Sequence, residues 1–254
     1  MADLELPLTA HLEELRSRLM RAVLALGVAF VACYPVSGRL VTLLTAPLMH
    51  ATSGSETGFQ LIGTGVAEAF YTRLKICVMA AIFLALPVIL YQAWMFVVPG
   101  LKETEARYAK SFVAAGTFFF FAGAWFCYAV IFPVGFPFFL SEYTDIGITP
   151  AIRIGEYLSF ASRMVLAFGL TFELPVASYF LARAGVITHH TLIRYARYSV
   201  VIIFIAAAVL TPSPDAASQI LMAGPLLLLY ALSIGIAYFA EQPRAAAEAP
   251  DAAL

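Results

Sequence analysis

Six long apolar stretches, separated by short polar segments, dominate this 254-residue chain. The expected spans are 22–38, 70–98, 111–140, 156–182, 198–210 and 216–240, and the uncharged parts of the second and fourth begin at Ile76 and Met164. A helix of about 20 apolar residues matches the hydrocarbon thickness of a bilayer. Because lipid offers no hydrogen-bond partners, a crossing segment must satisfy its backbone internally, as a helix does. We therefore expect an all-α polytopic membrane protein with six transmembrane helices.

The composition is too apolar for one water-soluble globule. Hydrophobic residues make up 62% of the chain and charged residues 12%, and the mean hydropathy is +0.88. Such values are typical of membrane proteins. We expect a single transmembrane domain over residues 1–240, no cleaved signal peptide, and a disordered, Ala- and Pro-rich tail over 241–254.

The basic residues predict the orientation of the chain. If the N-terminus is cytoplasmic, the inner side holds ten cations: Arg16, Arg18, Arg21, Lys102, Arg107, Lys110, Arg183, Arg194, Arg197 and Arg244. The outer side then holds five: Arg39, Arg73, Lys75, Arg153 and Arg163. Cations are enriched on the cytoplasmic side of membrane proteins, which favours cytoplasmic N- and C-termini.

The spans are unequal in length. The fifth, 198–210, offers 13 residues, or about 20 Å of helix, against a hydrocarbon core of about 30 Å. Either the bilayer thins beside it or the helix begins before Arg197. The third has 30 residues and should tilt, bend or project outward. We expect a concave, uneven body with short fifth and sixth spans.

The segment before the first span is amphipathic. Leu8, Leu12, Leu15 and Leu19 repeat with helical spacing in residues 8–21, which predicts an interfacial helix along the inner membrane surface. Glu14 lies off this apolar stripe. It either pairs with Arg18 one turn later or faces a partner.

In the first outer loop, "VTLLTAPLM" is apolar enough to lie against the spans as a cap, with Pro47 stiffening it. Catalytic and metal-binding motifs are absent from the sequence, and all four histidines lie outside the spans. We therefore expect no enzyme, no cofactor, no metal site and no nucleic-acid partner.

Glu173 is the one charged residue between Met164 and Ala182. A charged side chain at the centre of a membrane helix costs about 2.5–3.5 kcal/mol even on insertion scales, so it should line a pocket and contact a ligand. The alternative is a protonated acid that hydrogen-bonds a neighbouring helix for packing alone.

Five motifs carry a resemblance to a known family. They are "HLEELRSRL", "EAFYTRLK", "YQAWMFVVPGLKETEAR", "FGLTFELPV" and "TPSPDAASQILMAGPLLLLY". In order and spacing they resemble the TatC family, the multispanning receptor subunit of the twin-arginine protein translocase. The resemblance implies a protein of the cytoplasmic (inner) membrane that helps to export folded proteins by the proton-motive force.

The resemblance also implies partners and site residues. The partners are twin-arginine signal peptides of folded precursors, single-span subunits of the TatA and TatB types, further copies in a larger complex, and membrane lipid. Glu14, Arg16, Phe96 and Glu105 match the inner-face patch that binds the signal peptide. Glu173 matches the intramembrane glutamate, and the positions expected to support structure and partner coupling are Pro47, Asp215 and Gln219.

Two other functions stay open at this stage. An ion-coupled small-solute carrier would use Glu173 as its proton site. A scaffold protein would carry no cargo of its own. A carrier normally shows internal repeats, and none is evident in this sequence.

Overall fold

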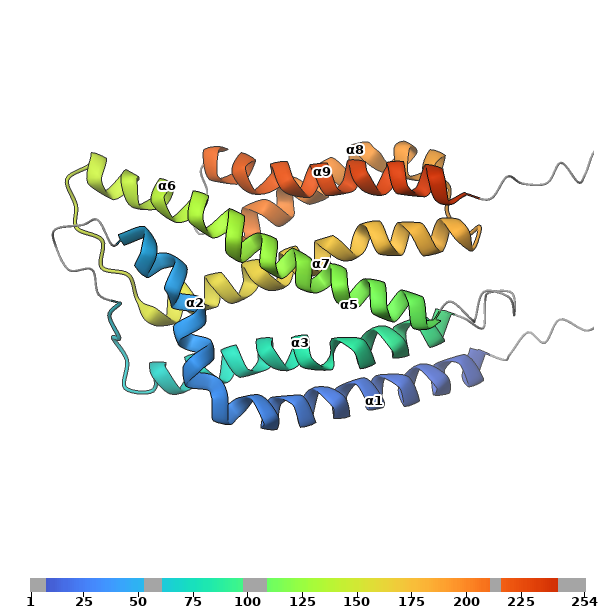
Figure 1. The fold of residues 1–254 in the computed structure, drawn as a ribbon, viewed down its shortest axis with the longest axis horizontal. Helices are drawn as coiled ribbons and strands as arrows, with labels where there is room; N and C mark the ends of the chain where they lie inside the picture. The colour runs from blue at the N-terminus through green and yellow to red at the C-terminus, as the bar shows by residue number, and fades with distance from the viewer. Residues whose placement is uncertain (1–7, 53–60, 98–108, 211–215, 242–254) are drawn as a thin grey trace, which may run out of the picture.

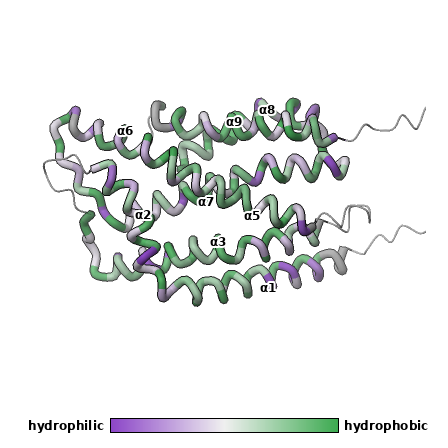
Figure 2. Tube along the Cα trace, viewed as in Figure 1, coloured by the Kyte–Doolittle hydropathy of each residue, from purple (hydrophilic) through white to green (hydrophobic). Residues whose placement is uncertain are grey.

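The computed structural model describes residues 8–52, 61–97, 109–210 and 216–241, and every extended regular element in these ranges is a helix. Six helical stretches are long and apolar enough to cross a membrane: Leu12–Thr52, Glu68–Phe96, Lys110–Tyr143, Ile154–Arg183, His189–Leu210 and Gln219–Ala240. The six predicted spans are therefore confirmed. Figure 2 shows that apolar residues occupy the middle of each long helix.

The first helix differs from its prediction. Helix α1 runs without a break from Leu8 to Cys33, so the amphipathic segment 8–21 is no separate interfacial helix but the start of the first long helix. Residues 8–26 contain neither Pro nor Gly, and their Leu, Ala, Glu, Arg and Met residues favour continuation of a helix. The chain instead turns at the short helix η1, Tyr34–Val36, where Pro35 lies in the first turn. Helix α2, Ser37–Thr52, follows directly.

The remaining helices follow their predictions with shifted ends. They are α3 (Glu68–Val97), α5 (Ala109–Phe126), the π-helical turn η3 (Cys127–Ile131), α6 (Phe132–Asp145), α7 (Ile154–Arg183), α8 (His189–Leu210) and α9 (Ala216–Ala240). Helices α5, η3 and α6 form the long third span. The wider π-helical turn precedes Pro133, whose missing N–H and bulky ring disturb the α-helical bonding of the turn before it.

The fifth span is longer than its apolar part. Helix α8 begins at His189, nine residues before Tyr198, so the alternative in which the helix starts before Arg197 is correct. Arg194 and Arg197 are exposed on this added part. Even so, the fifth and sixth spans are the shortest of the six, at 22 residues each.

The helices form an elongated bundle with two different ends (Figure 1). Helix α1 begins and α9 finishes at one end, called here the terminal end, where α3, α5, α7 and α8 also have an end. The opposite end, called the cap end, holds α2 and the last turns of α6. At the cap end, α6 extends further than α8 and α9 do, so the bundle is uneven there.

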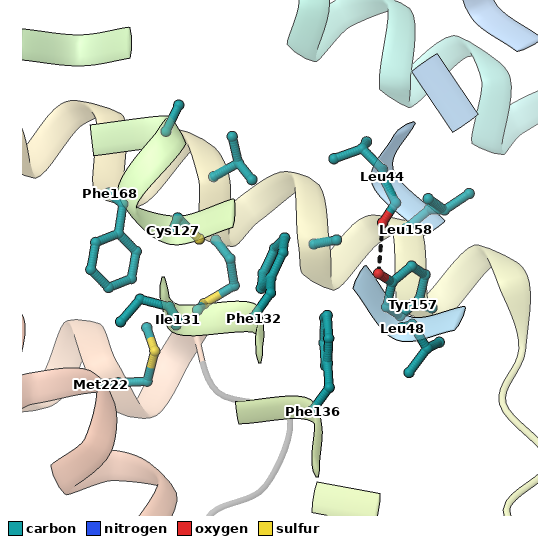
Figure 3. Close-up of a cluster of buried hydrophobic side chains, with 14 of the residues drawn as sticks. Leu44, Leu48, Cys127, Ile131, Phe132, Phe136, Tyr157, Leu158, Phe168 and Met222 are labelled. Atoms are coloured by element: carbon teal, nitrogen blue, oxygen red, sulfur yellow. Dashed lines mark hydrogen bonds between the residues drawn. The ribbon is translucent and has the colours of Figure 1, made fainter. Parts of the chain in front are cut away.

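Helix α7 is central to the bundle and packs against α2, α3, α5, α8 and α9. The main core surrounds it (Figure 3). Fully buried side chains from three parts of the chain meet there: Leu48 of α2, Phe132 of α6, and Leu158, Met164 and Phe168 of α7. Leu44 and Leu48 come from "VTLLTAPLM", so this segment lies against the spans as a cap, as predicted.

Helices α5 and α7 approach each other closely at glycines. A Cβ atom added at Gly123 would lie 2.5 Å from the carbonyl oxygen of Phe168 and 2.8 Å from the ring of Phe172. Small residues allow such contacts in membranes, where packing and not water exclusion drives helix association. Gly123 therefore sets the distance between these two helices.

We expect Gly123→Ala to destabilise the protein, because the backbone of α7 would have to move away. Overpacking of this kind costs about 1–3 kcal/mol, and the better helix propensity of Ala offsets only part of it. The measurement is the thermal unfolding midpoint in detergent. Gly224→Ala in α9 is the matched control, since a Cβ there meets nothing within 4 Å. Equal midpoints for the two variants would contradict the proposed close contact.

Candidate functional site

A shallow hollow on α1 lies at the terminal end and contains Glu14. Its lining residues are Glu13, Glu14, Ser17, Arg18 and Arg21, and its volume is about 330 Å³. The Arg18 guanidinium donates to Oε1 of Glu14 through Nε, at 3.0 Å, and through Nη2. The pairing of Glu14 with Arg18, which the sequence analysis left as one alternative, is therefore present.

This ion pair leaves Glu14 able to accept more hydrogen bonds. Both contacts from Arg18 use Oε1, and among the described residues Oε2 has no hydrogen-bond donor. The Glu14 side chain is 26% exposed. A carboxylate binds a second guanidinium well, because charge-assisted N–H···O bonds can form at both oxygens.

The other predicted residues of this patch, Arg16, Phe96 and Glu105, differ in exposure and in whether the structure describes them. Arg16 is exposed on α1, and Phe96 is partly buried near the end of α3. Trp94, in the same aromatic run, is buried, with its ring stacked on Phe112 at a centroid distance of 4.5 Å. Trp94 thus belongs to the core. Glu105 lies outside the described residues, in the segment that joins α3 to α5.

Glu173 faces the helices packed against α7. A Cβ atom added at Gly116 of α5 would lie 2.9 Å from Oε2 of Glu173 and 2.8 Å from Leu90 of α3. Oε1 of Glu173 is buried and has no hydrogen-bond partner among the described residues. The hydrogen bond expected for a purely structural acid is therefore not seen at this oxygen.

Buried polar atoms without a described partner also occur on the helices beside Glu173. They are Oε1 of Gln92 and Nε1 of Trp94 in α3, and Oγ1 of Thr117 in α5. A buried polar group that makes no hydrogen bond costs about 1–3 kcal/mol. Such groups are rare in folded proteins.

At the cap end, Pro47 leaves a backbone carbonyl without its helical donor. Proline has no N–H, so the carbonyl of Leu43, four residues earlier, loses its usual partner. The Tyr128 hydroxyl of η3 donates to this oxygen at 3.0 Å. The Tyr157 hydroxyl of α7 donates to the next carbonyl, that of Leu44, at 2.7 Å (Figure 3). Two tyrosines from the bundle therefore hold α2 where Pro47 interrupts its bonding.

Gln219 joins the last two helices. Its side-chain amide donates to the carbonyl of Phe204 in α8 at 2.9 Å. Asp215, which the sequence analysis grouped with it, lies outside the described residues. The Tyr230 hydroxyl donates to the Leu192 carbonyl at 2.8 Å, a second bond between α9 and α8.

Glu68, the first residue of the motif "EAFYTRLK", has a structural role that the sequence did not predict. Its carboxylate accepts the backbone N–H groups of Thr64 (2.7 Å), Gly65 (3.0 Å) and Gly155 (3.1 Å). It thereby ties the segment before α3 to the start of α7, where Ile62 and Arg153 form a β-bridge. The sequence signal is an acid in the first turn of a helix, where free N–H groups gather.

A second unforeseen contact lies at the terminal end. The Glu241 carboxylate accepts the backbone N–H of His189 and contacts Nδ1 of the same residue at 2.9 Å. The backbone N–H of His189, the first residue of α8, is the main cause that lowers the pKa of Glu241 below its usual value. The contact fastens the end of α9 to the start of α8.

Comparisons with known proteins agree on one family. The family model described as "Sec-independent protein translocase protein (TatC)" matches residues 10–225. A TatC protein of Desulforapulum autotrophicum is 45% identical over 90% of this chain and 83% of its own. One from Magnetococcus marinus is 40% identical over 97% of this chain and 89% of its own. A crystal structure titled "Twin Arginine Translocase Receptor- TatC" superposes with a TM-score of 0.81, at 34% identity, and covers 91% of this chain and 99% of that one.

These relatives are named for protein translocation, and none of these comparisons supports an ion-coupled small-solute carrier. Their names describe transport and not catalysis.

Within the described ranges, no group of three or more His, Cys, Asp or Glu side chains is arranged to hold a metal ion.

We expect Tyr128→Phe to destabilise the protein by about 0.5–1.5 kcal/mol, because the Leu43 carbonyl loses its donor. Pro47→Ala restores a backbone N–H four residues after Leu43. In that background Tyr128→Phe should cost much less, so the two substitutions should couple in a double-mutant cycle of thermal unfolding. Tyr71→Phe, at a 60% exposed tyrosine, is the control. The same loss in both backgrounds would refute the compensation of Pro47 by Tyr128.

Proposed function

The chain belongs to the TatC family of Sec-independent protein translocase proteins, and we propose that its terminal end binds the paired arginines of a signal peptide. The protein is a subunit of the translocase that exports folded proteins, and it acts there as the twin-arginine receptor. The family match over residues 10–225 carries this conclusion. The structural observation that supports the binding site is that Oε2 of Glu14 has no donor among the described residues.

The proposed site uses two carboxylates. Glu14 accepts one guanidinium through Oε2 while Arg18 keeps Oε1, and Glu105 accepts the second. Arg16 and Phe96 complete the patch, where Phe96 offers a ring against which a guanidinium can stack. Arg18 and Arg21 balance the charges of Glu13 and Glu14 in the hollow. A peptide guanidinium can donate to Oε2 of Glu14 and stack on a ring at the same time, which favours arginine over lysine, a point charge.

The terminal end is proposed to face the cytoplasm, with the protein in the cytoplasmic (inner) membrane. Both described chain ends lie at this end (Figure 1). The sequence assigns ten cations to it and five to the cap end. A cytoplasmic receptor site matches the side on which precursors with signal peptides are made.

Glu173 is proposed to contact either the inserted signal peptide or a partner's transmembrane helix. Its Oε1 atom is buried without a partner, and the residue is only partly covered. A neighbouring helix that brings a polar group to this depth would supply the missing hydrogen bond. Single-span TatA-type and TatB-type subunits are the proposed partner helices, and further copies of the chain complete a larger complex.

Pro47, Asp215 and Gln219 are proposed to support the cap end and the α8–α9 pair, away from the arginines. The bonds of Tyr128 and Tyr157 around Pro47 and the bond from Gln219 to Phe204 support this division of roles.

We expect Glu14→Gln and Glu105→Gln each to weaken binding of a paired-arginine signal peptide about ten- to hundredfold, because one charge-assisted bond contributes about 1.5–3 kcal/mol. The measurement is peptide affinity for folded, monodisperse protein in detergent, with a paired-lysine peptide as the ligand control. Glu142→Gln, at an exposed acid near the end of α6, is the protein control. Arg18→Gln separates the two roles of Glu14: if Glu14 only pairs with Arg18, neither Glu14→Gln nor Arg18→Gln changes the peptide affinity.

We expect a cysteine introduced by Glu173→Cys, with the three native cysteines replaced by alanine, to crosslink to a cysteine-bearing signal peptide or partner helix. Leu170→Cys, 68% exposed and one turn away, is the positional control. Glu173→Gln, which keeps the shape of the side chain, should lower transport while the thermal midpoint and arginine-peptide affinity stay unchanged. No crosslink together with normal transport by Glu173→Gln would leave Glu173 with a packing role alone.

A further inference from the structure

Cations at the cap end outnumber the acids available to pair with them. Five occur in the described residues of this half: Arg39, Arg73, Lys75, Arg153 and Arg163. Of these, only Arg153 forms an ion pair within the described part of the chain, with Glu156 at 2.9 Å. Cations are normally depleted on the side of a membrane protein away from the cytoplasm, so unpaired ones there suggest an anionic partner from outside the chain.

Lys75 and Arg163 converge on one residue. Nζ of Lys75, on α3, donates to the Ser159 hydroxyl oxygen at 3.2 Å. Nε of Arg163, on α7, donates to the Ser159 carbonyl oxygen at 3.2 Å. The Ser159 hydroxyl in turn donates to the carbonyl of Gly155 at 2.6 Å. Two cations from two helices thus contact the same serine, one at its hydroxyl and one at its carbonyl oxygen, and both cations are exposed.

Most of the hydrogen-bond donors on these two cations have no acceptor among the described residues. An ammonium has three N–H donors and a guanidinium has five. Each group donates one hydrogen bond to Ser159, and no carboxylate in the described ranges pairs with either cation. A ligand with several acceptor oxygens and negative charge fits this arrangement, as a phosphate group does.

Both cations lie close enough to the start of their helices for a long side chain to reach the headgroup layer. Helices α3 and α7 each have 30 residues, or about 45 Å, against a hydrocarbon core of about 30 Å. Several ångströms of each helix must therefore lie in the headgroup region. Lys75 lies seven residues after the start of α3 and Arg163 nine after the start of α7. Long cationic side chains near helix ends extend toward the headgroups.

Apolar surface continues from the two cations toward the middle of the bundle. Val78, one turn after Lys75, is 45% exposed, and Leu170, two turns after Arg163, is 68% exposed. On the other side of Lys75, Tyr71 is 60% exposed, which is typical of the aromatic belt at a membrane interface. Charge above an exposed apolar strip matches a phospholipid better than a soluble anion.

We propose that Lys75, Arg163 and Ser159 form a binding site for the phosphate of an anionic phospholipid in the leaflet at the cap end, whose acyl chain runs past Val78 and Leu170. An anionic headgroup such as that of phosphatidylglycerol fits best, because the ammonium of phosphatidylethanolamine is repelled by both cations. The bound lipid places one negative charge beside two cations, on α3 and α7, with which no carboxylate of the described residues pairs.

Native mass spectrometry of the full chain in detergent tests the site with phosphatidylglycerol as the probe. The double substitution Lys75→Gln with Arg163→Gln should weaken binding at least about tenfold, given the attraction of each cation to an anionic headgroup. The matched control is Arg39→Gln with Arg73→Gln, which removes two exposed cap-end cations away from Ser159 and should change binding by less than about twofold. The single substitutions replace the double one if it does not fold.

Three results would overturn the proposal. Equal losses in the double variant and its control would mean that only the total charge attracts the lipid. Equal binding of phosphatidylethanolamine and phosphatidylglycerol to the unchanged protein would exclude selection by the two cations. Displacement of bound phosphatidylglycerol by millimolar inorganic phosphate would assign the site to a soluble anion.

Discussion

In hydrocarbon every backbone polar group must find its partner inside the protein, and this constraint explains four side-chain hydrogen bonds between helices. Where Pro47 removes a donor from α2, Tyr128 and Tyr157 supply hydroxyl groups to the adjacent carbonyls. The cap end is therefore held by bonds whose partners are far apart in the chain. Gln219 and Tyr230 similarly bond backbone carbonyls of α8 from α9. These contacts stabilise the helix pairs without any need for charge inside the membrane.

The second constraint is that packing, and not exclusion of water, brings membrane helices together. Glycines on α5 allow close approach to α7, and the same approach places the Glu173 carboxyl against Gly116. The bundle thus surrounds an acid with backbone and apolar side chains and offers it few hydrogen bonds. In the proposed function, this acid contributes binding energy when a polar group arrives on another helix.

The two ends of the bundle differ in how their charges are used. At the terminal end, Glu14 and Arg18 form a partly exposed pair that still has an acceptor oxygen, which suits reversible binding of a guanidinium. At the cap end, Glu68 uses its carboxylate on backbone N–H groups and ties two segments together. Hydrogen bonds thus join separate segments of the chain at the cap end, while the terminal end carries the acids proposed to bind the signal peptide. A receptor that holds a folded precursor benefits from a stiff frame behind its binding surface.

The sequence by itself determined the all-helical class, the six spans, the cap formed by the segment around Pro47, and the family. These features depend on runs of apolar residues, on prolines and on motif spacing, which act over short stretches of chain. One local expectation failed, because the helix through residues 8–21 continues into the first span, and the longer of the two alternatives for the fifth span is the correct one, since α8 starts at His189. In both cases good helix formers continue a helix past the limit of its apolar part. Only the tertiary structure decided that Tyr128 compensates Pro47, that Glu173 lies against Gly116 and that Lys75 meets Ser159. Each of these contacts joins residues more than 50 positions apart, and such pairings follow from how whole helices pack, which no local pattern encodes.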